Sequence, residues 1–553
     1  MLLSLFAVFA HIHSASIDLQ DVIKEYADDV TTINLLDGSY FARGLHLANR
    51  DLTFLGREET VSLDLHECDV PAFFLENSSL TLVTFIVQPS PKAAIAQAQQ
   101  DSILNFTSCE FKTVEFSKPI LCGTRSKLIM NGTFVSDGVF FSSLIEGPAD
   151  TADPHLALVV DNSGFSNLEN KAQKPVLAGQ DVQNVIIFNS TFKRLLCQED
   201  GELPTKPVEG VANRSVVITA STVEYVAGAL GGGLVYGLQA SFLSLTNVRW
   251  IWGSNAPRFW DNVVFSKSIE VKIDSCNFSF SGTASPYLQN GGFLYLPHDT
   301  VNVTISNSTI FHPTTPNGHG GFIYTTGRST ITVEQCRIDN AEAGKSGAFI
   351  YAGKGVDAVT LVEVTFALSG AQEGGGLINL DGVKSFQARS VIFSACHVQK
   401  EGGLVYFNRS DNPSINFDNC IFVQNLQDPK KRYDVVIHYR TESKYNVKRK
   451  NFKNCTSTSR DRVHILPDDR RADWTNSRQT TIASTVAGVI IGVCVIIAVA
   501  FVLTFVSCYC GWCDASGCGR KKTGAYQHVE SQAIATSGHT QPYSDRHMSL
   551  YQK

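Results

Sequence analysis

The sequence predicts an all-β protein whose main domain is a single-stranded parallel β-helix, a solenoid in which each coil supplies about three short strands. Two patterns lead to this prediction: a pentapeptide that recurs about every 28 residues, and a set of apolar residues at fixed spacing between its copies. A fixed period of a few tens of residues is typical of solenoids, because each repeat buries its apolar face only against its neighbours.

The pentapeptide combines one or two glycines, two apolar residues and, in most copies, a tyrosine. Its copies are GGLVY (232–236), GGFLY (291–295), GGFIY (320–324), GAFIY (347–351), GGLIN (375–379) and GGLVY (402–406). Equivalent residues of neighbouring coils stack about 4.8 Å apart. The tyrosines should therefore form a ladder, broken at Asn379 and by a missing rung between Tyr236 and Tyr295.

These tyrosines are the candidate ligand contacts: Tyr236, Tyr295, Tyr324, Tyr351 and Tyr406. A ladder that faced outward would stack on sugars or on a partner protein. Inward stacking within the core is the orientation that we favour from the sequence.

The second pattern places apolar or small residues at offsets 0, 2, 5 and 7, as in Val271, Ile273, Cys276 and Phe278. Further copies begin at Leu104, Leu158, Val185, Val216, Val303, Ile331, Val359, Phe386 and Ile415. Steps of two put side chains on one face of a strand, whereas a helix needs steps of three and four. The pattern therefore predicts two short strands that meet at a bend.

Residues suited to turns occupy the bend at offset 4. Examples are Ser275, Asn307, Gln335 and Asn419. An antiparallel sandwich or a propeller would also give short strands and turns, but a propeller blade needs about 40 residues or more per repeat. The shorter repeat favours the parallel solenoid.

The composition agrees with a solenoid and excludes one class of partner. Of 553 residues, 42 are Gly, 34 Phe and 16 Tyr, and flat aromatic side chains can stack from coil to coil. The net charge is −6 and no basic aromatic patch is present, so we predict no nucleic-acid partner.

Two apolar segments at the ends of the chain predict membrane insertion. Residues 1–16 resemble a signal peptide in length, although a buried first strand is the alternative. Residues 482–506 carry no charge and are long enough to span a bilayer. The sequence thus predicts a β-helix over 17–457 outside the cell, a juxtamembrane linker over 458–481, one membrane helix over 482–506 and a disordered cytoplasmic tail over 507–553.

Sequons for N-glycosylation lie in the predicted outside segment and none lies in the tail, as expected for a secreted glycoprotein domain. The ten candidate asparagines are Asn77, Asn105, Asn131, Asn189, Asn213, Asn277, Asn302, Asn307, Asn408 and Asn454.

Cysteines at offset 5 of the repeat are expected to be small buried residues, because Ser and Val fill the same position in other repeats. They are Cys109, Cys276, Cys336 and Cys420. We expect one or two disulfides among the remaining outside cysteines, Cys68, Cys122, Cys197, Cys396 and Cys455.

The membrane segment and the tail carry three further patterns. Cys508, Cys510, Cys513 and Cys518 favour palmitoylation over a zinc site, because well-separated CxxC pairs and histidines are missing. Gly488 and Gly492 form a small-residue face for a homodimer of membrane helices. Tyr526 and Val529 match an endocytic YxxΦ motif, with a plain disordered tail as the alternative.

Residues 19–58, LQDVIKEYADDVTTINLLDGSYFARGLHLANRDLTFLGRE, resemble the opening of right-handed β-helix proteins of the pectin lyase type. This resemblance implies a capping helix over 19–26, a turn at Asp37, Gly38 and Tyr40, and a strand over 52–56. The glycine repeats resemble the GGA[ILV] motif of polymorphic outer-membrane (Pmp-type) adhesins and of similar surface proteins of parasitic protists. That second resemblance implies a role in adhesion.

The comparison with pectin-type hydrolases gives no complete catalytic constellation. Gly318, His319 and Gly320 match one hydrolase motif, but the NTD and RIK motifs are absent, and so is a DD pair among the repeats. Hydrolysis by this route needs paired carboxylates. We therefore predict no catalytic residue, no metal and no cofactor, and treat His319 as a turn residue.

Together these features predict a single-pass type I glycoprotein of the plasma membrane that acts in adhesion or recognition, with a glycan or protein ligand on another cell or matrix. The alternative is a membrane-tethered polysaccharide lyase or glycoside hydrolase. A receptor whose tail couples binding to uptake is a third hypothesis.

Overall fold

A computed structural model describes 19 ranges of the chain. They are 16–57, 60–112, 115–147, 155–171, 176–178, 182–197, 214–225, 240–252, 264–265, 270–280, 290–296, 301–372, 376–398, 404–408, 413–423, 434–439, 451–457, 463–467 and 472–473. The chain divides into two compact units, 1–479 and 480–553, and every described residue belongs to the first.

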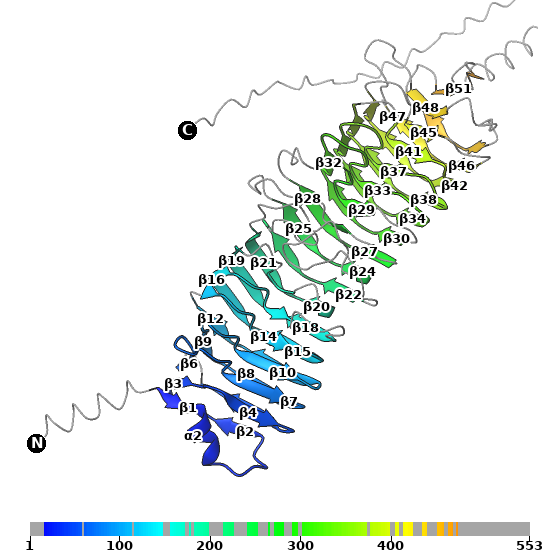
Figure 1. Cartoon of the computed structure of the whole chain (residues 1–553). Coiled ribbons are helices and arrows are strands. Elements are labelled where there is room, and N and C mark those ends of the chain that lie inside the picture. The colour runs from blue at the N-terminus through cyan, green and yellow to red at the C-terminus, as the bar shows by residue number, and fades with distance from the viewer. Residues whose placement is uncertain are drawn as a thin grey trace, which may run out of the picture. The chain divides into compact units, whose positions relative to one another are not determined.

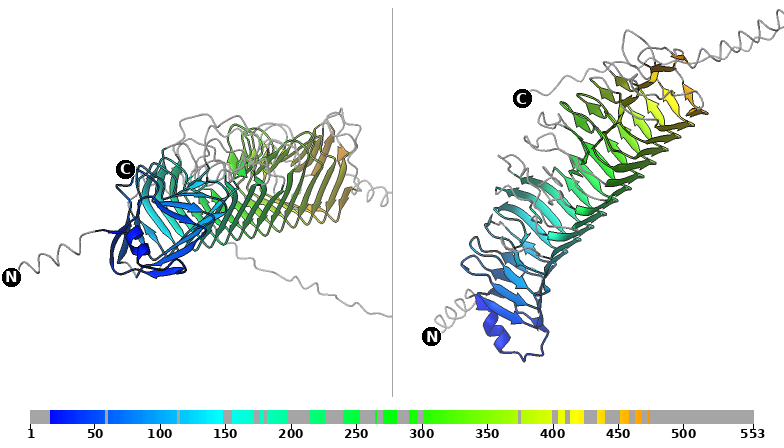
Figure 2. Two further views of the ribbon diagram at one scale, coloured as in Figure 1. Left: turned by 60° about the horizontal axis from the view of Figure 1, so that its bottom comes forward. Right: turned by 45° about the vertical axis from the view of Figure 1, so that its right-hand side comes forward.

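The first unit is a parallel β-solenoid in which coils stack one upon the next (Figure 1). Neighbouring coils pair in register, as in Val271 with Val303 and Ile305 with Val333. Two further views show the same stacked walls (Figure 2). The parallel β-solenoid that the repeats predict is therefore confirmed, and the sandwich and propeller alternatives are wrong.

Two long sheets run through the described part of the solenoid. Wall 1 has 16 strands: β2 (Thr32–Asn34), β5 (Asp51–Leu55), β8 (Ser79–Val83), β11 (Ser102–Thr107), β15 (Ser126–Asn131), β18 (Leu156–Asp161), β20 (Val182–Phe188), β22 (Arg214–Thr219), β24 (Ala240–Thr246), β27 (Glu270–Asp274), β30 (Val301–Ser306), β34 (Ser329–Glu334), β38 (Ala358–Val362), β42 (Ser385–Arg389), β46 (Ser414–Asp418) and β49 (Phe452–Lys453).

Wall 2 has 18 strands: β1 (Ile17–Asp18), β3 (Gly38–Phe41), β6 (Val61–Asp64), β9 (Ile86–Gln88), β12 (Glu110–Phe111), β13 (Glu115–Phe116), β16 (Phe134–Phe140), β19 (Gly164–Asn170), β21 (Thr191–Cys197), β23 (Thr222–Glu224), β25 (Arg249–Trp252), β28 (Asn277–Phe280), β31 (Thr309–Phe311), β35 (Arg337–Asp339), β39 (Thr365–Ala367), β43 (Ile392–Ser394), β47 (Ile421–Val423) and β50 (Thr456–Ser457).

The third side of the solenoid is built from two separate sheets. Wall 3N has five strands: β4 (Leu45–Ala48), β7 (Phe73–Glu76), β10 (Ala96–Gln99), β14 (Leu121–Gly123) and β17 (Ile145–Glu146). Wall 3C has nine: β26 (Val264–Phe265), β29 (Leu294–Leu296), β33 (Ile323–Thr325), β37 (Ile350–Ala352), β41 (Ile378–Asp381), β45 (Val405–Asn408), β48 (Asp434–Tyr439), β51 (Val463–Pro467) and β52 (Ala472–Asp473).

A small accessory sheet accompanies wall 3C. Its four strands are β32 (Thr314–Thr315), β36 (Glu342–Ala343), β40 (Gly370–Ala371) and β44 (His397–Val398). Each lies between a strand of wall 2 and the next strand of wall 3C along the chain. The sequence patterns did not predict this sheet.

One short helix, α2 (Leu19–Lys24), lies at the N-terminal end of the solenoid (Figure 1). The Asp18 side chain accepts a hydrogen bond from the Gln20 backbone N–H at 2.9 Å, which caps the helix start. Leu19 is buried, and Val22 and Ile23 pack against the core. The helix thus ends at Lys24, two residues before the end of the range 19–26 expected from the sequence.

The core follows the predicted offsets. Val271, Ile273, Cys276 and Phe278 are all buried, and the residues between them point outward. The bend residues Ser275, Asn307, Gln335 and Asn419 have φ angles between 49° and 54°, in the left-handed region. Asn and related polar residues tolerate this conformation best after Gly, which explains their recurrence there.

The buried residues at offset 5 form a hydrogen-bonded ladder along the solenoid. The backbone N–H of each rung donates to the side chain of the next: Ser163 to Ser190 Oγ at 3.1 Å, Ser190 to Ser221 Oγ at 3.1 Å, and Cys276 to Ser308 Oγ at 3.0 Å. Small size alone was predicted for this position. The position also favours a polar side chain that accepts a hydrogen bond from the N–H of the neighbouring rung, because a buried N–H without a partner would cost about 1–3 kcal/mol.

Cys109, Cys276, Cys336 and Cys420 are buried, as predicted. Among the cysteines whose side chains the structure describes, Cys68, Cys122, Cys396 and Cys455 are also free thiols. The expected disulfides within that group are therefore not formed in this structure. The Cys197 side chain lies outside the described part.

Within the described ranges, no helix is long and apolar enough to cross a bilayer. Several predicted features lie outside those ranges: residues 1–15 of the signal peptide, the span 482–506 with Gly488 and Gly492, the tail cysteines, and the Tyr526 to Val529 motif.

Candidate functional site

The pentapeptide copies at 291–295, 320–324 and 347–351 form the turns that lead into β29, β33 and β37 of wall 3C. Gly320, its first residue in one copy, has φ 71°, which glycine adopts without strain. A Cβ on the second residue, Gly321, would lie 2.4 Å from the Glu342 carbonyl oxygen and 2.6 Å from that of Ala348. Strand β36 of the accessory sheet therefore passes so close that only glycine fits at position 321.

The strand that follows turns its tyrosine outward. In the copy at 320–324, Phe322 and Ile323 are fully buried, whereas Tyr324 is half-buried. In β29, Leu294 and Leu296 are buried on either side of half-buried Tyr295. Because successive side chains of a strand point to opposite faces, the tyrosines lie on the outer face. The inward orientation that we favoured from the sequence is therefore wrong.

Three of the tyrosines stack as neighbouring rungs. The ring centroids of Tyr295 and Tyr324 lie 5.3 Å apart, and those of Tyr324 and Tyr351 lie 5.1 Å apart, with interplanar angles of 23° and 9°. Both faces of the Tyr324 ring are thus covered by its neighbours. The middle of this tyrosine ladder offers a ligand ring edges and phenol oxygens rather than open ring faces.

Burial favours the neutral form of the Tyr295 and Tyr324 phenols. Burial, together with the neighbouring Tyr295 and Tyr351, raises the pKa of Tyr324 to about 12. Burial likewise raises the pKa of Tyr295. At neutral pH these side chains are uncharged, and a neutral phenol can both donate and accept a hydrogen bond.

Asn379 interrupts the ladder. It pairs in register with Tyr351 on one side and Tyr406 on the other. The residue is only 6% exposed, and its Oδ1 atom has no hydrogen-bond partner among the described residues. Of the five tyrosines predicted as ligand contacts, three stack directly, Tyr406 stands beyond Asn379, and Tyr236 lies outside the described part.

His319 lies at the ladder, a position that the sequence did not reveal. Its ring centroid is 4.6 Å from that of Tyr351, and its Nδ1 atom is 2.7 Å from Ser346 Oγ. Its backbone N–H donates to Asn290 Oδ1 at 3.0 Å. The predicted turn residue thus also belongs to the aromatic surface, through a contact between neighbouring coils that short motifs do not encode.

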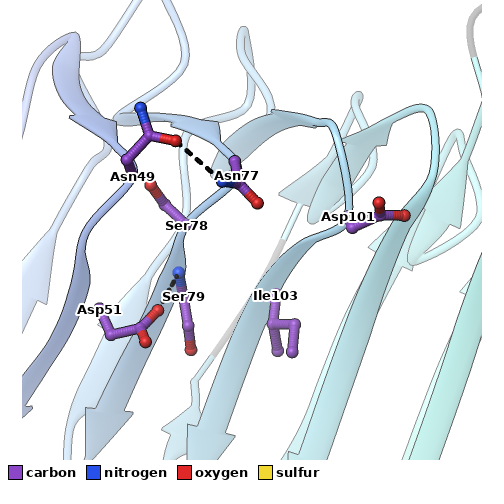
Figure 3. A pocket seen from close by; sticks show the side chains of 7 residues that line it. All are labelled: Asn49, Asp51, Asn77, Ser78, Ser79, Asp101 and Ile103. Atoms are coloured by element: carbon purple, nitrogen blue, oxygen red, sulfur yellow. Dashed lines mark hydrogen bonds between the residues drawn. The ribbon is translucent and has the colours of Figure 1, made fainter.

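A second, polar hollow of about 350 Å³ lies at the corner between wall 3N and wall 1 (Figure 3). Asn77 Nδ2 donates to Asn49 Oδ1 at 2.8 Å, and the Ser79 N–H donates to Asp51 Oδ1 at 3.0 Å. Asp101 is paired with Arg125 at 2.8 Å. The residues that line the hollow are Asn49, Asp51, Asn77, Ser78, Ser79, Asp101 and Ile103.

This hollow lacks a metal-binding cluster among the residues that the structure describes. Within the described ranges, no group of three or more His, Cys, Asp or Glu side chains is close enough to hold a metal ion. The two carboxylates of the hollow already accept hydrogen bonds from Ser79 and Arg125. The tyrosine ladder therefore remains the better candidate for ligand contact.

Most predicted glycosylation sites have exposed side chains where the structure describes them. Exposed are Asn77, Asn131, Asn189, Asn277, Asn302, Asn307 and Asn454. Asn105 is half-buried on wall 1, and its Oδ1 atom is buried without a hydrogen-bond partner among the described residues. Asn213 and the side chain of Asn408 lie outside the described part. Modification itself stays a prediction at all ten.

No protein-family model matches the sequence, Pmp-type adhesins included, and no curated protein is similar to it. Among solved structures, tailspike protein 3 (TSP3) of bacteriophage CBA120 is similar at 11% identity and a TM-score of 0.26, over 73% of this chain and 61% of the tailspike chain. A PL6 alginate lyase in complex with a trisaccharide is similar at 9% identity and a TM-score of 0.19, over 84% of this chain and 91% of the lyase. The chain has the parallel β-solenoid fold, and no residue role is carried over from these two proteins.

Proposed function

We propose that the solenoid is the extracellular recognition domain of a single-pass type I glycoprotein of the plasma membrane. The predicted signal peptide, the uncharged segment 482–506 and the exposed sequons support this topology. In this proposal α2 covers the N-terminal end of the core, which agrees with the packing of Val22 and Ile23.

The ligand, a glycan or a protein on another cell or matrix, is bound along the tyrosine ladder. The observation that carries this proposal is the outward stack of Tyr295, Tyr324 and Tyr351. The core does not need outward aromatic rings, and aromatic side chains are enriched where proteins bind partners. Many copies on one membrane would strengthen such shallow contacts by multivalency.

The test is binding of the full-length chain, in detergent micelles, to a glycan array and to intact cells. We expect Tyr324→Leu to weaken binding by about tenfold or more, because it removes the middle rung. Tyr324→Phe separates the role of the hydroxyl from that of the ring.

Phe74→Leu is the matched control, since Phe74 occupies the equivalent outward position on wall 3N. Equal binding by the wild type and by Tyr324→Leu would contradict the proposal. Cleavage of a polysaccharide by the same sample would instead favour the hypothesis of a tethered lyase or hydrolase.

A further inference from the structure

Cys420 and Cys455 occupy neighbouring rungs of the offset-5 ladder at the C-terminal end of walls 1 and 2. The residues that follow them, Ile421 of β47 and Thr456 of β50, pair in register. The Thr456 N–H donates to the Cys420 carbonyl oxygen at 2.9 Å. In-register neighbours lie about 4.8 Å apart, within the Cα separation of 4.4–6.8 Å that disulfides accept.

The ladder brings the two sulfur atoms toward each other. On an earlier rung the Val248 N–H donates to Cys276 Sγ at 3.4 Å. Cys420 and Cys455 occupy successive rungs in the same way, and their side chains are close enough for each thiol to shift the pKa of the other. The Cys420 sulfur also lies 3.4 Å from the Ala388 carbonyl oxygen, so it points into the ladder.

Other cysteines of the ladder have different neighbours. Ser308 separates Cys276 from Cys336, and Thr133 follows Cys109. Within the described ranges, 420 and 455 are the rungs at which this position holds cysteine on two successive coils. The pair combines one cysteine that the sequence predicted as a core residue with one that it predicted as a disulfide partner.

The environment of the two thiols differs in a way that suits stepwise oxidation. Cys420 is fully buried, whereas Cys455 is partly exposed. Their mutual hydrogen bond raises the pKa of Cys420 and lowers the pKa of Cys455. The thiolate is the reactive form, so the accessible Cys455 reacts first.

We propose that Cys420 and Cys455 form a disulfide that fastens the coil of β49 and β50 to the coil of β46 and β47. The oxidant is a small-molecule or protein disulfide, as found in oxidising compartments. The Cys455 thiolate attacks a sulfur of that disulfide and releases one thiol. Cys420 then loses its proton to the medium and attacks the Cys455 sulfur, which releases the second thiol and leaves the new S–S bond.

This bond would act where the solenoid is easiest to open. Strands β49 and β50 have two residues each, so few backbone hydrogen bonds hold their coil to the preceding one. A coil near the end of a solenoid also has fewer neighbours to pack against than a coil in the middle. A covalent link closes the intervening chain into a loop and stabilises that coil against local opening.

The test uses the full-length chain, equilibrated with oxidised glutathione, quenched with an alkylating reagent and digested without reductant. Mass spectrometry should find the Cys420 peptide linked to the Cys455 peptide, with Cys276 and Cys336 alkylated after unfolding. Two alkylated thiols at 420 and 455 would overturn the proposal. So would Cys455 linked to a different cysteine or to a second chain.

Cys420→Ser gives a variant that should fold, because serine holds the same ladder position at 163, 190, 221 and 308. Cys276→Ser is the matched control, since its neighbouring rungs carry no cysteine. Reductant should lower the melting temperature of oxidised wild type and of Cys276→Ser by about 2–4 °C, and leave Cys420→Ser unchanged. An equal response of all three proteins would contradict the proposed link. The outcome does not depend on whether the tyrosine ladder binds a ligand.

Discussion

Wall 3N and wall 3C form the same side of the solenoid with the same inward alternation, yet their outer columns differ. On wall 3N the column of in-register residues is His46, Phe74, Gln97, Cys122 and Glu146. On wall 3C, from β29 to β45, it is Tyr295, Tyr324, Tyr351, Asn379 and Tyr406. His46 and Phe74 stack at 4.6 Å, but no such contact continues along the wall 3N column in the described coils.

The difference shows which part of the repeat the fold requires. Both walls bury their inward residues, such as Leu75 and Ile323, so the core fixes that face. The outward face is left free by packing, and only wall 3C repeats one aromatic residue there. A repeated residue at a position that the core does not constrain is better explained by an outside role than by stability.

The largest effect on stability is expected from a substitution in the turn that leads into wall 3C. Gly321 of wall 3C and Pro71 of wall 3N occupy equivalent positions, each three residues before the outward residue of its strand, Tyr324 and Phe74. Gly321→Ala should destabilise the solenoid by about 3 kcal/mol, because the new Cβ would meet two backbone carbonyls that cannot move away. Pro71→Ala should cost less than about 1 kcal/mol.

Urea unfolding of both variants measures this difference. Similar losses at positions 321 and 71 would mean that the two walls turn alike, and that the accessory sheet does not press on Gly321.

An intermediate loss of stability is expected when the pH rises above 10. The folded pKa of Tyr324, about 12, lies above its ordinary value of 10.0. The unfolded chain therefore loses the Tyr324 proton first, so stability is full below pH 10 and falls as the pH rises toward 12. Tyr324→Phe should remove this part of the decline, whereas Phe74→Leu on wall 3N should leave it unchanged.

Thermal unfolding between pH 9 and 12 measures the decline, and phenolate absorbance reports the ionisation directly. Ionisation of all tyrosines near pH 10 would show that the ladder rings are freely solvated, contrary to their stacking.

The smallest effect on stability is expected at the corners that follow wall 3N and wall 3C, because both corners carry an exposed ion pair. The ion pairs Arg125–Asp101 and Lys384–Asp357 lie at the corners that lead from wall 3N and wall 3C into wall 1, and both are well exposed. Exposed pairs contribute about 0–1 kcal/mol and are screened by salt. Arg125→Ala and Lys384→Ala should each change unfolding in urea by less than about 1 kcal/mol, with no difference at high salt. A larger loss at one corner would reveal a further contact there.

The inward face and the bends could be predicted from the sequence because both are local. Offsets 0, 2, 5 and 7 mark alternating side chains, and Asn307 or Asn419 marks a left-handed bend. The direction of the tyrosine side chains could not be predicted from the sequence, because an aromatic residue suits the core as well as the surface. Phe322 and Ile323, both buried, leave Tyr324 only the outer face, and this becomes visible once the corner geometry is known.

Contacts between coils could not be predicted from the sequence either. His319 contacts Tyr351 and Ser346 of the following coil, and β36 of that same coil lies close to Gly321. No short motif records such neighbours, because they depend on the lengths of the intervening turns.

The register of the walls has a mechanical consequence. The backbone hydrogen bonds between coils run along the solenoid axis, as between the Thr309 N–H and the Cys276 carbonyl oxygen. A pull along that axis therefore loads the boundaries between coils in series, so the weakest boundary opens first while the others stay closed. Tension applied at one end would be relieved coil by coil from that boundary, rather than by unfolding of the whole domain at once.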